Sequence, residues 1–164
     1  MKIGDIVVTK NSGVCIIVDK QEIVFGGNTK EYFILNQYFE NENNRAKIFV
    51  PCDNLSLIRP VINKEKVLEI IRQMPLMEKI WDNDQKIRKA KYEEIYKSGD
   101  IYGICQIVKS LYLQNEQLKL TKHTLSMLDK ECLNNLKKAI FQEFAVAFEL
   151  PFDEVESFIS KQIG

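Results

Sequence analysis

The pattern of hydrophobic positions along this chain changes its period near residue 60. Before that point, short apolar runs of strand length alternate with turn residues, whereas residues 63–163 carry apolar side chains at helical spacing. A block of strands followed by a block of helices indicates two modules, because each kind of element needs its own apolar face covered. The sequence therefore predicts an α+β chain with one module over residues 1–60 and a second over residues 61–164.

The first module contains five short apolar runs that predict strands. They cover residues 6–8, 14–18, 22–25, 31–35 and 47–51. Turn signals at Asn11-Ser12-Gly13 and Gly26-Gly27-Asn28 separate them, and the polar stretch Asn41–Arg45 predicts a longer loop. Pro51 lacks an N–H group, so it is expected at a strand end or sheet edge. Such strands suggest a small antiparallel barrel of SH3 or Tudor type, a class that binds through a strand edge or an aromatic cleft.

The second module predicts a compact bundle of five helices. The first is expected from the cap Asn63 to Met74, the second from Asn83 or Asp84 to Lys97, the third from Asp100, the fourth over 124–148, and a short fifth after Pro151. Leucine and phenylalanine dominate the apolar stripes, and at this spacing they are typical of a packed core and not of cofactor ligands.

Composition and charge narrow the class of protein. The chain of 164 residues has 23 basic and 23 acidic residues, so a protein that coats long stretches of nucleic acid is disfavoured, while a local basic patch fits. The cysteines, Cys15, Cys52, Cys105 and Cys132, form no CxxC pair, which favours buried thiols in a reducing cytosol. No secretory leader and no apolar span of membrane length is visible, so we expect a cytoplasmic protein without a membrane partner.

Catalytic chemistry has little support in the sequence. His123 is the only histidine, and no cysteine, serine or aspartate relay accompanies it, so a surface or capping role is expected. Gly26-Gly27 is followed by neither a helix nor a Lys-Ser/Thr pair, which favours a hairpin turn over a phosphate loop. We therefore expect no enzymatic activity, no cofactor and no metal.

A tryptophan beside a basic cluster is the pattern most typical of a binding site. Trp81, the only tryptophan, precedes Lys86, Arg88, Lys89 and Lys91. Cations contact phosphates, and an indole can stack on a base or wedge at a base step. At 100° per residue, Lys86 and Lys89 fall on an outer arc, while Arg88 and Lys91 lie toward the apolar side. A solvated helix face beside a core tryptophan explains the same residues, so both interpretations stay open.

Several short motifs follow one another in a recognisable order. In the first module the motifs are residues 4–8, Gly13, Lys30-Glu31-Tyr32, Val50-Pro51 and Arg59. In the second module they are Trp81, Ser98-Gly99-Asp100, Leu125-Ser126, Asp129, Leu133 and residues 143–147. Each motif alone is weak, but their order and spacing are specific. Over essentially its whole length the chain resembles the CarD/CdnL family of bacterial transcription regulators.

The resemblance implies a function for each module. The Tudor-like module, which also occurs in transcription-repair coupling factor, would bind the RNA polymerase β subunit, and the helical module would contact promoter DNA at the upstream edge of the transcription bubble. This implies DNA contacts from Trp81, Lys86, Arg88, Lys89 and Lys91, and polymerase contacts from Tyr32, Ile34, Lys47, Phe49 and Pro51. The chain departs from the family pattern in the wide spacing between Trp81 and Gly99, in Ile23 and Phe49 where some relatives carry arginines, and in a longer loop over 39–45.

The sequence leaves other interpretations open. The main alternative is a protein–protein adaptor that uses the barrel without direct DNA binding, which the neutral net charge favours slightly. A nucleic-acid-modifying enzyme is disfavoured by the lack of clustered His, Cys or carboxylate ligands. We expect a monomer associated with the nucleoid through polymerase, although the short junction at Arg59-Pro60 also permits exchange of a module between two copies. The regulated promoters, and activation or repression, do not follow from the sequence.

Overall fold

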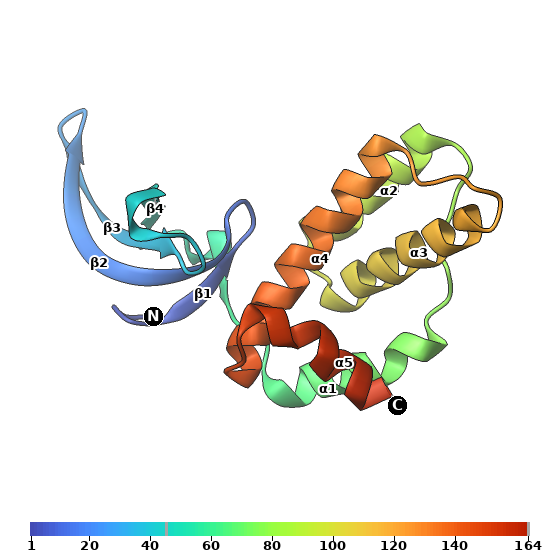
Figure 1. The fold of residues 1–164 in the computed structure, drawn as a ribbon. Coiled ribbons are helices and arrows are strands. Elements are labelled where there is room, and N and C mark those ends of the chain that lie inside the picture. The colour runs from blue at the N-terminus through green and yellow to red at the C-terminus, as the bar shows by residue number, and fades with distance from the viewer. Residues whose placement is uncertain (45, 164) are drawn as a thin grey trace. The chain divides into compact units, whose positions relative to one another are not determined.

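The computed structural model describes residues 1–44 and 46–163, and their elements fall into two compact units (Figure 1). The boundary between the units lies between Ile62 and Asn63. Arg45, the last residue of the predicted polar loop 41–45, and Gly164 lie outside the described residues. The first unit holds the strands and the second holds the helices, so the α+β class expected from the sequence is confirmed.

The described part of the first unit is a five-stranded antiparallel sheet. Its strands are β1 (Ile6–Thr9), β2 (Gly13–Phe25), β3 (Asn28–Gln37), β4 (Ile48–Pro51) and β5 (Ile58–Pro60). Their order across the sheet is β4-β3-β2-β1-β5, and the short 3-10 helix η2 (Leu55–Leu57) lies between β4 and β5 along the chain. β2 and β3 curve strongly (Figure 1), as expected for a small barrel of SH3 or Tudor type.

Two of the predicted strands form one continuous strand. The apolar runs 14–18 and 22–25 both belong to β2, because the polar residues between them continue the pairing with β3. The register shifts between Ile17 and Asp19, and such a bulge bends a hairpin. The fifth strand of the sheet is β5, whose residues Arg59 and Pro60 the sequence analysis had placed at the junction between the modules. Its Pro60 lies opposite Val7 on the edge of the sheet, where a missing N–H is tolerated.

A tight turn and an apolar core hold this unit together. Gly26 and Gly27 join β2 to β3 with φ angles of 59° and 82°, the left-handed geometry of a two-residue hairpin turn, so no phosphate loop forms there. The core consists of Val7, Cys15, Ile17, Phe33, Leu35, Val50 and Ile58, all buried. The polar loop before β4 contains a second 3-10 helix, η1 (Glu42–Asn44).

The described part of the second unit contains five α-helices. They are α1 (Lys64–Gln73), α2 (Gln85–Ser98), α3 (Ile101–Lys119), α4 (Met127–Phe148) and α5 (Val155–Ile163). The 3-10 helix η3 (Met74–Leu76) follows α1, and η4 (Phe152–Glu154) precedes α5. α3 packs on α2 and α4, and α1 packs on α4 and α5.

Side-chain caps set where three of these helices begin. The Asn63 side chain accepts a hydrogen bond from the Lys66 amide, and the Asp84 carboxylate accepts from the first amides of α2, as their positions in the sequence predict. α4 begins later than the predicted residue 124, because Ser126 supplies the cap by accepting from the Asp129 amide. Gly99 ends α2 with a φ of 73°.

All four cysteines are free thiols, and burial raises the pKa of Cys105 to about 12. His123 is exposed in the turn after α3, with its Nδ1 3.1 Å from the Thr121 hydroxyl. Within residues 1–44 and 46–163, no three His, Cys, Asp or Glu side chains gather as metal ligands. In the same part of the chain, no helix has the length and apolar content needed to cross a bilayer.

Candidate nucleic-acid interface

Trp81 lies in an irregular segment between η3 and α2, and polar side chains fix that segment to its neighbours. The Ile80 amide donates to the Ser110 hydroxyl at 2.7 Å, and the Tyr92 hydroxyl donates to the Ile80 carbonyl at 2.7 Å. The Lys109 ammonium, on α3, donates to the Met77 carbonyl at 2.7 Å. Because backbone groups outside regular structure need such partners, these bonds define the path of the chain up to Trp81.

The Tyr92 hydroxyl is suited to this task at neutral pH. Burial raises the pKa of the phenol to about 12, and this effect outweighs the opposing influence of the nearby Arg88 charge. The phenol therefore keeps its proton and can donate it to the Ile80 carbonyl.

The indole of Trp81 is neither a core residue nor a freely exposed one. Its ring is partly exposed, and the centre of the Arg88 guanidinium lies 4.0 Å from the ring centroid. The indole N–H donates to the side chain of Asn83 at 3.1 Å, and the Lys79 ammonium lies farther away, at 5.9 Å. A cation stacked this closely on an aromatic ring attracts it electrostatically. The ring therefore has a defined pose while part of it stays accessible.

Arg88 lies in the interior of the unit. Only 6% of the residue is exposed, and its guanidinium forms an ion pair with Asp129 on α4, with Nη2 2.6 Å from Oδ2. Nη1 also donates to the carbonyls of Asp82 and Asn83 at 2.8 and 3.3 Å. Its Nε, Nη1 and Nη2 atoms all donate within the protein, so the direct contact of Arg88 with DNA stays a prediction that this burial does not favour. The helical position had placed it toward the apolar side, but nothing local indicated a partner 41 residues away.

The remaining cations of the predicted cluster lie at the surface. Lys86, Lys89 and Lys91 are exposed on α2, whose basic residues outnumber its acidic ones. The Asp84 carboxylate accepts from the Lys86 and Ile87 amides, so these two N–H groups are already bonded, and the lysine side chains carry the positive charge that an anion would meet. Glu93 is also exposed on this helix, and its charge weakens the field farther along it. The positive surface is therefore concentrated in the first two turns of α2, close to Trp81 in sequence.

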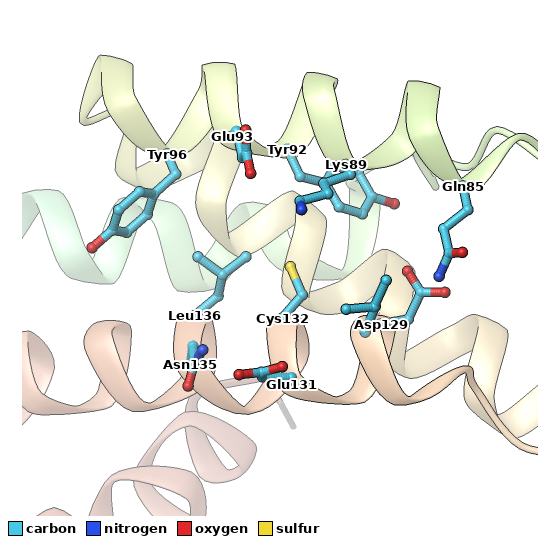
Figure 2. A pocket seen from close by; sticks show the side chains of 11 residues that line it. Gln85, Lys89, Tyr92, Glu93, Tyr96, Asp129, Glu131, Cys132, Asn135 and Leu136 are labelled. Atoms are coloured by element: carbon cyan, nitrogen blue, oxygen red, sulfur yellow. The ribbon is translucent and has the colours of Figure 1, made fainter.

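A groove of about 460 Å³ separates α2 from α4 (Figure 2). Cys132 points from α4 into this space, and Leu136 lies beside it, while Lys89 and Glu93 line the α2 side. Burial, and to a lesser extent the carboxylates of Asp129 and Glu93, raise the pKa of the Cys132 thiol. The groove thus combines an apolar floor with charges of both signs, and it does not extend the basic surface.

The residues that sequence reasoning missed are those that support the tryptophan. Asp129 and Ser126 stand three positions apart at the start of α4, a spacing at which a serine hydroxyl can cap the helix. The cap is present, but the Ser126 hydroxyl also donates to the Asp129 carboxylate at 2.8 Å, and the same carboxylate binds Arg88. Gln85 adds a further bond to the Ser126 hydroxyl at 3.0 Å, which ties the start of α2 to the start of α4.

The predicted polymerase-binding residues lie on β3 and near β4, the edge strand. Tyr32 pairs with Pro51 and Ile34 with Phe49, so these four share neighbouring positions on the sheet. Phe49 is 48% exposed, Lys47 is exposed, and Tyr32 and Pro51 are partly exposed. Ile34 is only 2% exposed, and its strand is paired on both sides. The contact of Ile34 with polymerase stays a prediction, and the burial of this side chain does not favour it.

The charge of Lys47 acts on the carboxyl group of Asp19, which lies in the same region of the sheet. Hydrogen bonds from the Gln21 side chain and the Lys20 amide lower the pKa of the Asp19 carboxyl, and the Lys47 charge adds to this effect. Asp19 lies opposite Ile34, one strand farther from the edge. The exposed surface next to β4 therefore combines the Phe49 ring with charged groups, a mixture that is typical of protein–protein contact surfaces.

An antiparallel sheet with an exposed edge strand, joined to a helical unit that presents a supported tryptophan, defines a two-module binding protein. Residues 1–62 match the family model of the CarD-like/TRCF RID domain, and residues 66–160 match that of the CarD C-terminal domain. No significant match to a curated protein sequence was found. The chain belongs to the CarD family, as its resemblance indicated, and is a non-enzymatic transcription regulator that interacts with RNA polymerase.

Proposed function

We propose that this protein binds the RNA polymerase β subunit through its sheet and stabilises the open promoter complex through its helical unit. The observation that carries the proposal is the partly exposed indole of Trp81, stacked on Arg88 and followed by the exposed Lys86 and Lys89. An indole and a set of cations together suit DNA that is partly melted.

The lysines supply attraction that does not depend on sequence. Lys86, Lys89 and Lys91 contact phosphates, whose charge is present in duplex and melted DNA alike. These contacts hold the helical unit on the promoter without favouring the open state.

Trp81 supplies the preference for the melted state. An aromatic ring gains stacking energy only where a base is exposed or a base step is unstacked, as at the upstream edge of the bubble. Contacts made only in one state shift the population toward that state. A gain of about 1.4 kcal/mol would raise the ratio of open to closed complexes about tenfold.

The sheet supplies the connection to polymerase. β4 lies at an edge, and an exposed edge can accept a further strand from a partner, with main-chain hydrogen bonds giving affinity. Lys47 and Phe49 border this edge and would contact side chains of the β subunit, with Tyr32 and Pro51 beside them. Docking of this unit would raise the local concentration of the helical unit near the upstream DNA.

The test compares the wild type with Trp81→Ala on complexes of RNA polymerase holoenzyme and a promoter fragment. A pull-down should show equal polymerase binding by both proteins. After addition of a competitor, the open complexes should decay about 5- to 150-fold faster with the variant, because one base stack is worth about 1–3 kcal/mol. Binding to intact duplex should change little.

Thermal unfolding must accompany this comparison, since Trp81 also packs on Arg88. A Trp81→Ala protein that melts like the wild type and prolongs open complexes equally well would refute the role of the indole. Failure of the wild-type chain to capture holoenzyme would refute the role of the sheet.

A further inference from the structure

Arg88 contacts Trp81 and the chain that follows it at the same time. Its guanidinium stacks on the indole at 4.0 Å, and its Nη1 atom donates to the carbonyls of Asp82 and Asn83. The Asn83 side chain in turn accepts the indole N–H. The ring and the backbone that carries it are therefore both attached to one guanidinium group.

The orientation of that guanidinium is set by Asp129. Two roughly parallel contacts, Nε to Oδ1 at 3.4 Å and Nη2 to Oδ2 at 2.6 Å, fix the plane of the Arg88 group. The carboxylate is itself fixed, because it accepts the Ser126 hydroxyl and both Arg88 and Asp129 are buried. Since the guanidinium carbon lies over the ring, a chain of contacts runs from the start of α4 through Arg88 to the indole.

Stability alone does not explain this arrangement. A buried ion pair can often be replaced by apolar side chains of similar volume with no loss, and sometimes a gain, of stability. A stacking side chain, by contrast, benefits from being held in its productive pose before the partner arrives, because less conformational freedom is lost on binding. From these contacts we infer that Arg88 and Asp129 are positioning residues, which hold the Trp81 indole in the pose that meets unstacked DNA. This inference rests on the proposed function of Trp81.

The test exploits the fact that Trp81 is the only tryptophan, so fluorescence excited at wavelengths that tyrosine does not absorb reports on this side chain alone. The main variant is the double change Arg88→Met and Asp129→Leu, which removes both charges and keeps similar volumes. Arg88→Lys keeps a cation but loses the planar group. Lys79→Met is the matched control, because it removes the exposed and more distant cation at 5.9 Å from the ring.

In the free protein, the double variant should melt like the wild type, yet its tryptophan should be quenched more efficiently by acrylamide and show faster local depolarisation. Arg88→Lys should shift both signals in the same direction, and Lys79→Met should leave both unchanged. With polymerase and a promoter fragment, the open-complex lifetime should fall about tenfold for the double variant, which lies within the range of one lost base stack.

Wild-type quenching and anisotropy in a folded double variant would overturn the inference, as would an equal change in Lys79→Met. If the double variant does not fold, Arg88→Lys decides the question by the same two signals. The fluorescence is measured without DNA, so it is separable from the proposed function. If Trp81→Ala leaves open-complex lifetimes unchanged, the proposed function fails, and the fluorescence still decides whether Arg88 and Asp129 hold the ring.

Discussion

Removal of Lys86 and Lys89 should change the salt dependence of DNA binding by a calculable amount. Each phosphate neutralised on duplex DNA contributes about −0.9 to the slope of log affinity against log salt concentration. If Lys86, Lys89 and Lys91 each neutralise one phosphate, the wild-type slope should be about −2.7, and that of Lys86→Ala/Lys89→Ala about −0.9. Between 50 and 200 mM salt, the wild type should then lose about 40-fold in affinity and the variant about 3.5-fold.

The assay is a fluorescence anisotropy titration of the 164-residue chain against a labelled promoter fragment at several salt concentrations. The matched control is Lys138→Ala/Lys161→Ala, which removes the same charge from exposed positions on α4 and α5. Neither double variant should shift the unfolding midpoint appreciably, because the substituted side chains are exposed. An unchanged slope in the α2 variant, or an equal reduction in the control, would refute direct phosphate contacts by Lys86 and Lys89.

Three further changes probe other parts of the structure. Tyr92→Phe should cost about 1–3 kcal/mol of unfolding free energy, because the Ile80 carbonyl loses its donor. In denaturant titrations, the difference in unfolding free energy between wild type and variant should shrink between pH 10 and 12, because there the unfolded but not the folded wild type releases the phenol proton. Gly103→Ala should lower the melting temperature by calorimetry, because the added carbon would lie 2.8 Å from the Asp100 carboxylate and must displace it. Phe49→Glu should leave stability within about 0.5 kcal/mol but abolish capture of polymerase in a pull-down, and unchanged capture would exclude this ring from the interface.

Features that depend on neighbouring residues could be predicted from the sequence, whereas strands that depend on pairing with distant residues could not. Asn63 could be assigned as a cap, and the cap of α2 narrowed to Asn83 or Asp84, because a cap depends only on the residues beside it. The strand β5 was missed because three residues containing a proline carry no periodic signal, and pairing with β1 alone makes them a strand. β2 was divided in two because the polar residues from Asp19 onward pair with β3 beyond the apolar core.

The same distinction between local and distant contacts applies to the residues of the candidate site. Trp81 and the exposed lysines could be found from residue type and spacing, since those properties belong to one short stretch of sequence. The support for the indole could not be found in that way, because Arg88 and Asp129 meet only after α2 and α4 have packed. The burial of Ile34 could not be predicted from its apolar run either, because it depends on what the fold brings around this side chain, and its contact with polymerase stays a prediction.

The polar side of α3 has a consequence for how this chain can diverge in evolution. Gln106, Lys109 and Ser110 would pass for ordinary solvent-facing residues, yet each bonds to the backbone between Pro75 and Ile80. Ser110 is completely buried and uses its hydroxyl both to donate to the Gln106 carbonyl and to accept from Ile80. Drift at these three positions should therefore be as restricted as drift at leucine positions of the core, and a homologue that changes one of them should carry a compensating change in the segment before its tryptophan.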